Sequence, residues 1–176
     1  MIFVETPLAN AYVVEPERLA DERGFFARIF EPLEFEAYGL NPNVKQSSLS
    51  FNPRKGTLRG MHFQHPPFAE AKLVRCTRGA VHDVIIDLRR ESKTYLGHLG
   101  VELDAESRRM LYVPEGFAHG FLTMTDDAEV TYQISARYSP EHASGVRWND
   151  PAFGIEWPGP VVLINERDRS YPDYRP

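Results

Sequence analysis

The sequence lacks the features of a membrane protein, a disulfide-stapled domain or a nucleic-acid-binding protein. Cys76 is the only cysteine, so no internal disulfide is possible, and this usage suits a reducing compartment, which we expect to be the cytoplasm. The apolar runs are far too short to span a bilayer, and the first residues lack the basic and apolar regions of a secretion signal. Twenty basic and 25 acidic residues give a net charge of −5, whereas nucleic-acid binders usually carry a basic surplus. We therefore expect no membrane and no nucleic-acid partner, although a local arginine cluster could still hold a small anion.

Familiar catalytic motifs are also missing. No serine lies in a Gly-x-Ser-x-Gly elbow, which removes support for hydrolysis by a serine nucleophile. No glycine-rich loop of the phosphate-holding type is present. The chain has no heptads, no repeat period and no low-complexity tract. We therefore expect any chemistry to come from residues that are dispersed along the chain.

What the sequence does contain is many short β-rich runs and very little helical periodicity. Its 176 residues fit one domain, residues 1–176, which is long enough to bury a core. Fourteen prolines and 12 glycines separate the runs, and strands this short and numerous favour an all-β sandwich or barrel of jelly-roll type. One short helix is expected at Pro32–Tyr38, and the tail after Trp157 is expected to wrap over the domain. The expected strands are Tyr12–Glu15, Phe25–Phe30, Val44–Ser50, Thr57–Gln64, Lys72–Arg78, Val81–Leu88, Leu99–Leu103, Met110–Val113, His119–Met124 and Glu129–Ser135.

The segment from Gly56 to Gln64 reads Gly-Thr-Leu-Arg-Gly-Met-His-Phe-Gln and carries unusual polar content. Because side chains alternate along a strand, His62 and Gln64 share one face and Arg59 lies on the other. If the first face lines the barrel, His62 and Gln64 point into a ligand site and Arg59 points away, unless Gly60 marks a bulge that turns a side chain round. Taken alone, such a histidine is more often structural than functional.

A second segment, Val113–Phe121, places His119 between an alanine and a glycine, which leaves room for another group to approach the ring. Lys72 opens an apolar run and could stabilise an oxyanion beside a histidine. Tyr132 could give up or take a proton. Each residue also has an ordinary explanation: a buried histidine, a strand-end lysine and a packing tyrosine. Their combination in a barrel-like pattern favours a polar catalytic cavity.

Metal binding is a separate possibility, because two histidines on neighbouring strands could join Glu70 as ligands at the mouth of a barrel. Metal-binding barrels of the cupin type use a His-x-His pair. This chain has His62-Phe-Gln64 instead, and a glutamine amide is a poor substitute for an imidazole. The sequence therefore favours a site with no metal.

Several strings of residues become specific when they are taken together, and they closely resemble the dTDP-4-dehydrorhamnose 3,5-epimerase family. The resemblance runs in order from about residue 2 to about residue 173, and its most specific pieces are Leu-Arg-Gly-x-His and Pro-x-Gly-Phe-Ala-His-Gly-Phe. The strings are Asp21-Glu-Arg-Gly-Phe-Phe26, Gly56-Thr-Leu-Arg-Gly-Met-His-Phe-Gln64, Lys72-Leu-Val74, Pro114-Glu-Gly-Phe-Ala-His-Gly-Phe121, Tyr132 and Trp148-Asn-Asp-Pro151.

The resemblance implies a fold and an activity. The fold is an all-β cupin-type double-stranded β-helix (jelly roll) with short peripheral helices, in a homodimer that needs no metal. The activity is that of an isomerase, which inverts C3, C5 or both in a nucleotide-linked 4-keto-6-deoxy sugar by way of an enolate. The type reaction converts dTDP-4-dehydro-6-deoxyglucose to dTDP-4-dehydrorhamnose, in deoxysugar or cell-surface polysaccharide biosynthesis.

The resemblance also implies roles for individual residues. It makes His62 the general base, Asp168 its carboxylate partner, Lys72 the enolate-stabilising lysine and Tyr132 the general acid. The chemistry suits these side chains, because histidine takes protons near neutral pH and a ketone acidifies the neighbouring carbon without a redox cofactor. The implied substrate-binding residues are Arg23, Phe26, Arg28, Gln46, Ser48, Arg59, His119 and Arg167.

The chain departs from the family pattern mainly at expected contacts to the nucleotide sugar. Arg28 stands where the family commonly has glutamate, and Ser48 where it has asparagine. Ala143 replaces a glutamate, Arg167 replaces a lysine, and the loop Phe51–Lys55 is one residue longer. The expected acid, base and lysine are retained. The chemistry is therefore predicted better than the identity of the nucleotide or sugar.

Two alternatives from other classes stay open at this point. One is a metal-dependent cupin enzyme, such as a dioxygenase or isomerase, which stoichiometric metal in the purified protein would favour. The other is a non-catalytic module that binds sugar nucleotides. Binding alone requires no acid–base pair, so the retained His62, Asp168, Lys72 and Tyr132 argue against the second alternative.

Overall fold

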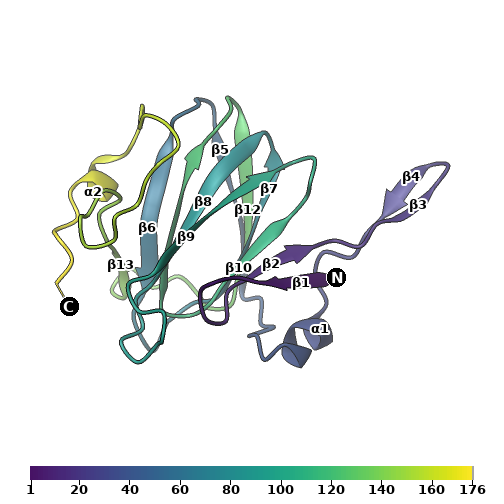
Figure 1. Ribbon diagram of the computed structural model, residues 1–176, viewed down its shortest axis with the longest axis horizontal. Coiled ribbons are helices and arrows are strands. Elements are labelled where there is room, and N and C mark those ends of the chain that lie inside the picture. The colour runs from purple at the N-terminus through teal and green to yellow at the C-terminus, as the bar shows by residue number, and fades with distance from the viewer. Residues whose placement is uncertain (176) are drawn as a thin grey trace.

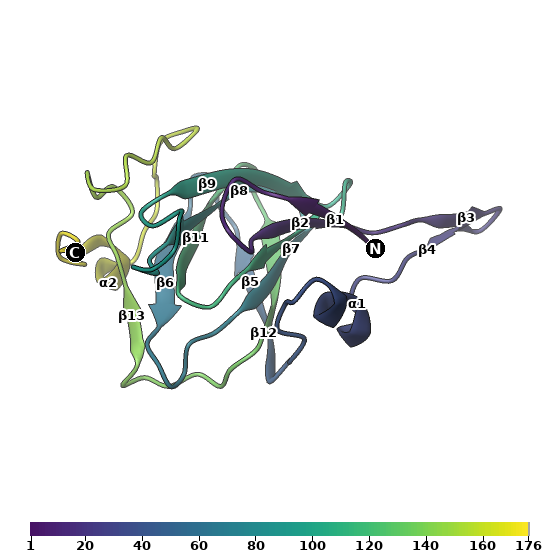
Figure 2. The ribbon, with the colours of Figure 1, turned by 60° about the horizontal axis from the view of Figure 1, so that its bottom comes forward.

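Two antiparallel sheets face each other in the computed structural model, which describes residues 1–175 (Figure 1 and Figure 2). The six-stranded sheet has the order β1-β2-β10-β7-β12-β5, and the five-stranded sheet has the order β13-β6-β11-β8-β9. This arrangement confirms the expected all-β jelly roll. The strands of the two sheets are β1 (Ile2–Glu5), β2 (Tyr12–Glu15), β5 (Gln46–Asn52), β6 (Leu58–Gln64), β7 (Lys72–Arg78), β8 (Ala80–Asp87), β9 (His98–Asp104), β10 (Met110–Val113), β11 (Phe117–Thr123), β12 (Ala128–Ile134) and β13 (Ala143–Gly145).

The main hydrophobic core lies between the two sheets, where it fills part of the space that separates them. Alternation along β7 and β12 turns branched side chains inward, where they meet the inner face of β8 and β11. Burying such side chains contributes about 1.5–3 kcal/mol each, which holds the sheets together. The fully buried members include Val74, Cys76, Ile85, Leu111, Phe121 and Val130.

The outer face of each sheet has its own cover. Helix α1 (Pro32–Ala37) starts with a proline at its first position, and the Glu31 carboxylate accepts a hydrogen bond from the Glu34 N–H at 2.9 Å. Its buried Phe35 packs with Val14 and Met110 on the six-stranded sheet. The expected helix over Pro32–Tyr38 is thus confirmed, one residue shorter.

The C-terminal segment covers the five-stranded sheet, as predicted for the tail after Trp157. Trp157 packs against the cluster on the outer face of this sheet, and its indole N–H donates to the Trp148 carbonyl at 3.0 Å. Leu163 forms a parallel bridge with Thr57, just before β6. The segment then forms the short helix α2 (Glu166–Arg169), which lies beside β6.

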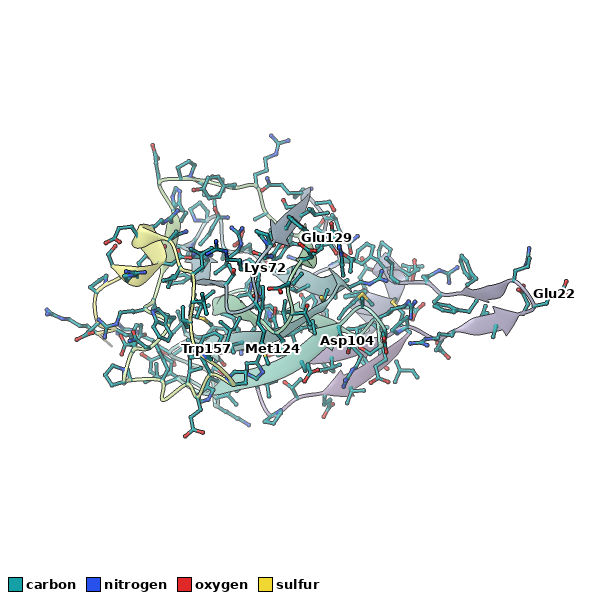
Figure 3. The ribbon with its side chains drawn as sticks, turned by 90° about the horizontal axis from the view of Figure 1, so that it is seen from above. Glu22, Lys72, Asp104, Met124, Glu129 and Trp157 are labelled. Carbon is teal, nitrogen blue, oxygen red and sulfur yellow. The ribbon has the colours of Figure 1, made fainter. Side chains whose placement is uncertain are left out.

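A small hairpin of β3 (Leu19–Asp21) and β4 (Gly24–Phe26) stands away from the body as an arm (Figure 1 and Figure 2). We call residues 19–26 the arm. Among the described residues, its strands pair only with each other, and Phe26 is 65% exposed. Figure 3 shows Glu22 at the tip of the arm, far from Lys72 in the body.

The structure corrects several expected elements. The prediction of one strand over Phe25–Phe30 is wrong, because β4 has only the three-residue β3 as a partner and ends at Phe26. The strand expected at Val44–Ser50 lies two residues later, at Gln46–Asn52. The sequence did not predict β1, β3, β13 or α2, each of which has only three or four residues. Within residues 1–175, no helix is long and apolar enough to cross a membrane.

Candidate active site

A cavity of about 480 Å³ opens between the two sheets at one end of the jelly roll. Its volume lies within the range of small-molecule sites. Strands β5, β7 and β12 form one wall, and β6 and β11 form the other. The lining residues are Gln46, Ser48, Ser50, Arg59, His62, Phe63, Gln64, Glu70, Lys72, His119, Phe121, Tyr132, Ile134, Tyr138, Ala143, Ser144 and Arg167.

A bulge in β6 brings Arg59 and His62 into the same cavity. In the register with β11, His119 lies opposite His62, whereas Phe121 lies opposite Arg59, so β6 has one extra residue over this stretch. Gly60 lies there with φ +139°, and an added Cβ would come within 2.5 Å of the Gly120 Cα. Simple alternation, which turned Arg59 away from His62, is therefore wrong, and the bulge at Gly60 is the reason. Gly120, the glycine beside His119, has no side chain and so allows the backbones of β6 and β11 to approach closely.

His62 is held by a carboxylate from the C-terminal segment. Its Nε2 lies 2.7 Å from Asp168 Oδ1, and the other oxygen of Asp168 accepts the Gly60 N–H at 3.1 Å. Helix α2 fixes Asp168, because the Asn165 side chain accepts its backbone N–H at 2.7 Å. Asp168 is 1% exposed, whereas the His62 side chain is 40% exposed to the cavity. The pair therefore leaves Nδ1 of His62 as the nitrogen that faces a bound molecule.

His119 has a carboxylate partner of its own. Its Nε2 lies 2.9 Å from both oxygens of Asp83, which is fully buried on β8. The two histidine–aspartate pairs thus lie side by side on the five-stranded sheet, since His62 and His119 are direct partners across β6 and β11.

Lys72 and Tyr132 occupy the opposite wall. The Lys72 ammonium forms an ion pair with Glu70 at 3.0 Å. The Tyr132 hydroxyl lies 3.1 Å from Ser50 Oγ, and its ring meets the ring of His119 edge to face at 6.2 Å. Burial raises the pKa of Tyr132 well above its ordinary value, so the phenol stays protonated at neutral pH.

Polar groups at the cavity wall complete the site. Arg59 donates from Nε to the Asn52 side chain at 2.7 Å, which fixes the guanidinium at the cavity. Gln46 and Ser48 enter from β5, and Arg167 enters from α2. Interaction with the Tyr138 and Tyr171 hydroxyls raises the pKa of Arg167 further, so it remains a cation. Two guanidinium groups therefore line a cavity that could hold an anionic ligand.

The structure places three of the expected binding residues elsewhere. Arg23 lies in the turn of the arm, where its guanidinium pairs with Asp21. Phe26 and Arg28 lie at the base of the arm and line a separate hollow with Glu34. Within one protomer, Arg23, Phe26 and Arg28 are therefore not brought to the cavity. The other nine expected residues either line the cavity or, like Asp168, lie directly behind it.

Sequence reasoning missed several residues that line the cavity or lie directly behind its wall. Asp83 carried a usable signal, since it is an acidic residue inside the apolar run Val81–Leu88. Ser50 and Tyr138 carried no signal of their own, because a serine on an edge strand and a tyrosine in a loop are ordinary. Glu70 was considered only as a metal ligand.

The residues weighed for metal binding are occupied by protein contacts. The Gln64 side-chain oxygen accepts the Ser139 N–H at 2.7 Å, and its amide nitrogen donates to Glu70 at 3.0 Å. Glu70 in turn holds Lys72. Among the residues that the structure describes, no group of three or more His, Cys, Asp or Glu side chains is arranged to hold a metal ion.

Fold and site together define a protein of the cupin type, with histidine–aspartate pairs and a tyrosine in one cavity, and comparison with known proteins specifies its family. Residues 5–175 match the family described as dTDP-4-dehydrorhamnose 3,5-epimerase. A relative of that name from Methanothermobacter thermautotrophicus is 43% identical over 176 aligned residues, which cover 98% of this chain and 94% of the relative.

Solved structures agree. That of dTDP-4-dehydrorhamnose 3,5-epimerase from Elizabethkingia anophelis superposes with a TM-score of 0.96 at 38% identity, and the match covers 99% of this chain and 96% of the other. The enzyme of the same name from Bacillus anthracis, with TDP and PPi bound, has a TM-score of 0.93 at 38% identity and covers 98% and 99%. The chain belongs to the dTDP-4-dehydrorhamnose 3,5-epimerase family.

Proposed function

We propose that this protein epimerises a nucleotide-linked 4-keto-6-deoxy sugar at C3, C5 or both, of the dTDP-4-dehydro-6-deoxyglucose type, within deoxysugar or cell-surface polysaccharide biosynthesis. The observation that carries the proposal is the placement of a histidine–aspartate pair and a protonated tyrosine on opposite walls of one cavity. Inversion at a carbon requires a proton to leave on one face and return on the other, and this arrangement supplies both groups.

The proposed mechanism begins at His62. Its Nδ1 removes the hydrogen from the carbon beside the ketone, and Asp168 stabilises the imidazolium that forms. The electrons of the broken C–H bond form an enolate, whose oxygen lies near the Lys72 ammonium and His119. Tyr132 then donates its proton to the opposite face of the carbon, and the C–H bond forms again with inverted configuration.

Binding of the nucleotide is assigned to the polar wall of the cavity and to the arm. Arg59, Arg167, Gln46 and Ser48 are proposed to contact the diphosphate and the sugars. We further propose a homodimer in which the arm of one protomer reaches the cavity of its partner, where Arg23, Phe26 and Arg28 would complete the nucleotide site. The arm exposes Leu19, Phe25 and Phe26 together, which supports this role because contiguous exposed apolar patches often mark interaction sites. We place the enzyme in the cytoplasm, where the thiol of the buried Cys76 would remain reduced.

The test is turnover of a panel of nucleotide 4-keto-6-deoxy sugars in deuterated water, followed by NMR. The expected result is deuterium at each inverted carbon, so the number of labelled carbons gives the number of centres that are inverted. His62→Ala should reduce incorporation by about 10²–10⁴ while the fold is kept, whereas His98→Ala, an exposed histidine on β9, serves as the matched control and should retain full activity. Binding without exchange across the panel would instead favour a sugar-nucleotide-binding module.

A further inference from the structure

The Lys72 ammonium is fixed before any substrate arrives. Its nitrogen forms an ion pair with Glu70 Oε1 at 3.0 Å and donates a hydrogen bond to the His62 backbone carbonyl at 3.3 Å. The side chains of Lys72 and Glu70 are only 8% and 11% exposed. An ammonium has three N–H donors, so at least one remains for an oxygen of a bound molecule. The contact with the His62 carbonyl also ties the ammonium to the residue that carries the base.

Glu70 is itself held in place by Gln64. The second carboxylate oxygen of Glu70 accepts the Gln64 side-chain amide at 3.0 Å. The same amide nitrogen lies 2.9 Å from the Phe68 carbonyl and 3.1 Å from the Arg137 carbonyl. Gln64 is 3% exposed, and with its oxygen bound to Ser139 its hydrogen-bonding groups are all in use. The two oxygens of Glu70 therefore have different fixed partners, which determines the orientation of the carboxylate.

The contacts of Gln64 and Glu70 give the Lys72 ammonium a fixed position, which the lysine side chain alone does not provide. Lysine carries its charge on a flexible four-carbon stem, which by itself gives no fixed position. Electrostatic stabilisation of an enolate works best when the charge already lies where the negative charge develops, in a site shielded from water. The chain Gln64–Glu70–Lys72 supplies this fixed position, whereas a surface ion pair would not.

We propose that Glu70 is a positioning residue for the epimerisation, which holds the Lys72 ammonium where the enolate oxygen forms. This inference rests on the proposed function, and it adds a residue whose role is to hold Lys72 rather than to transfer a proton. If Glu70 only stabilised the fold, its replacement would change the unfolding temperature, and any effect on activity would not depend on the presence of Lys72.

The test is a double-mutant cycle with Glu70→Gln, Lys72→Met and the double variant, measured as kcat, KM and deuterium exchange. Glu70→Gln keeps the shape and removes the charge. We expect it to lower kcat and exchange together by about 10²-fold, the size expected for a misplaced catalytic group, with KM changed by less than about threefold. In the Lys72→Met background the same substitution should change kcat by less than about threefold, since its target is gone.

Controls keep the outcomes distinct. Glu129→Gln removes a partly buried carboxylate, bonded to Thr77 and away from the cavity, and should leave activity unchanged. Glu70→Asp keeps the charge but is too short to contact both Lys72 and Gln64. It should show an intermediate loss with an intact circular dichroism spectrum, even if Glu70→Gln folds poorly.

Three results would overturn the inference. They are wild-type kcat in folded Glu70→Gln, equal losses from Glu70→Gln with and without Lys72, or an effect confined to KM. An inactive wild type across the whole substrate panel would instead remove the proposed function, and this inference with it.

Discussion

Replacing Tyr132 with phenylalanine should separate the two halves of the proposed reaction. The ring packs edge to face against His119, and phenylalanine fills the same space. Only the hydroxyl is lost, together with its 3.1 Å contact to Ser50. His62 and Lys72 lie on other strands and keep their partners, so removal of the α hydrogen should continue.

The expected size of the effect follows from what the hydroxyl does. Losing a general acid costs about 10²–10⁴ in rate, or about 3–5 kcal/mol of activation free energy. Losing one hydrogen bond costs about 1 kcal/mol of folding stability, and partly exposed Ser50 can rebind water, so the variant should fold. The proton must then return from His62 or from water, and return by His62 restores the original configuration. The variant should wash solvent deuterium into unepimerised substrate and form little epimer.

The assay is NMR of substrate and product during turnover in deuterated water, so that exchange and inversion are counted separately in one sample. Tyr95→Phe is a matched control, because the Tyr95 hydroxyl pairs with Tyr174 and does not line the cavity. Epimerisation by Tyr132→Phe at the wild-type rate would refute the reasoning, since another group or a water would then be the acid. Equal loss of exchange and inversion would show that Tyr132 also contributes to the first step.

Further outcomes follow from the same geometry. Asp168→Asn should lower kcat by about 10²–10⁴ with a near-normal KM, because an amide neither stabilises the imidazolium nor fixes the ring of His62 in the same tautomer; steady-state kinetics on folded protein checks this. Prolonged chelation should leave activity intact, since Gln64 is engaged by protein groups, and activity lost to chelator and restored by one divalent ion would contradict this. Because burial raises the pKa of Tyr132, a plot of kcat against pH should show no loss of the acid form below about pH 10, the ordinary tyrosine pKa. Arg23→Ala should raise KM far more than it lowers kcat, and the protein should sediment as a dimer.

Residues with a strong local pattern could be placed from the sequence. The strands Tyr12–Glu15, Lys72–Arg78 and Met110–Val113 are observed with the expected bounds, because apolar runs between turn residues specify them locally. Elements of three or four residues could not be predicted, because their stability comes from partners such as β6 for β13. The arm is such a case, since a hairpin without other partners has little pattern to detect.

Some residues of the candidate site could likewise be predicted from local sequence, and others could not. His62 and His119 were suspected from their glycine-rich surroundings, but alternation misplaced Arg59, because a bulge depends on how β6 meets β11. Asp168 could be linked to His62 only through family resemblance, since nothing local to residues 166–169 points across 106 positions to a histidine. Asp83 and Glu70 show that the sequence pattern alone can point to further candidate residues. An acidic side chain beside or within a buried strand has to be paired, and its partner is a candidate for function.

The route by which Asp168 reaches His62 bears on how the protein should lose activity on heating. Within residues 1–175, the cluster between the sheets contains no residue from the C-terminal segment. This segment is held instead on the outer face of the five-stranded sheet by a smaller apolar cluster and by backbone bonds such as Leu58 N–H to the Leu163 carbonyl at 2.8 Å. Segments of this kind open at lower free energy than a central core. Thermal inactivation should therefore begin below the temperature at which the β-sheet signal of circular dichroism is lost. In that interval the barrel would persist with its base unsupported, and cooling should restore turnover without refolding of the sheets.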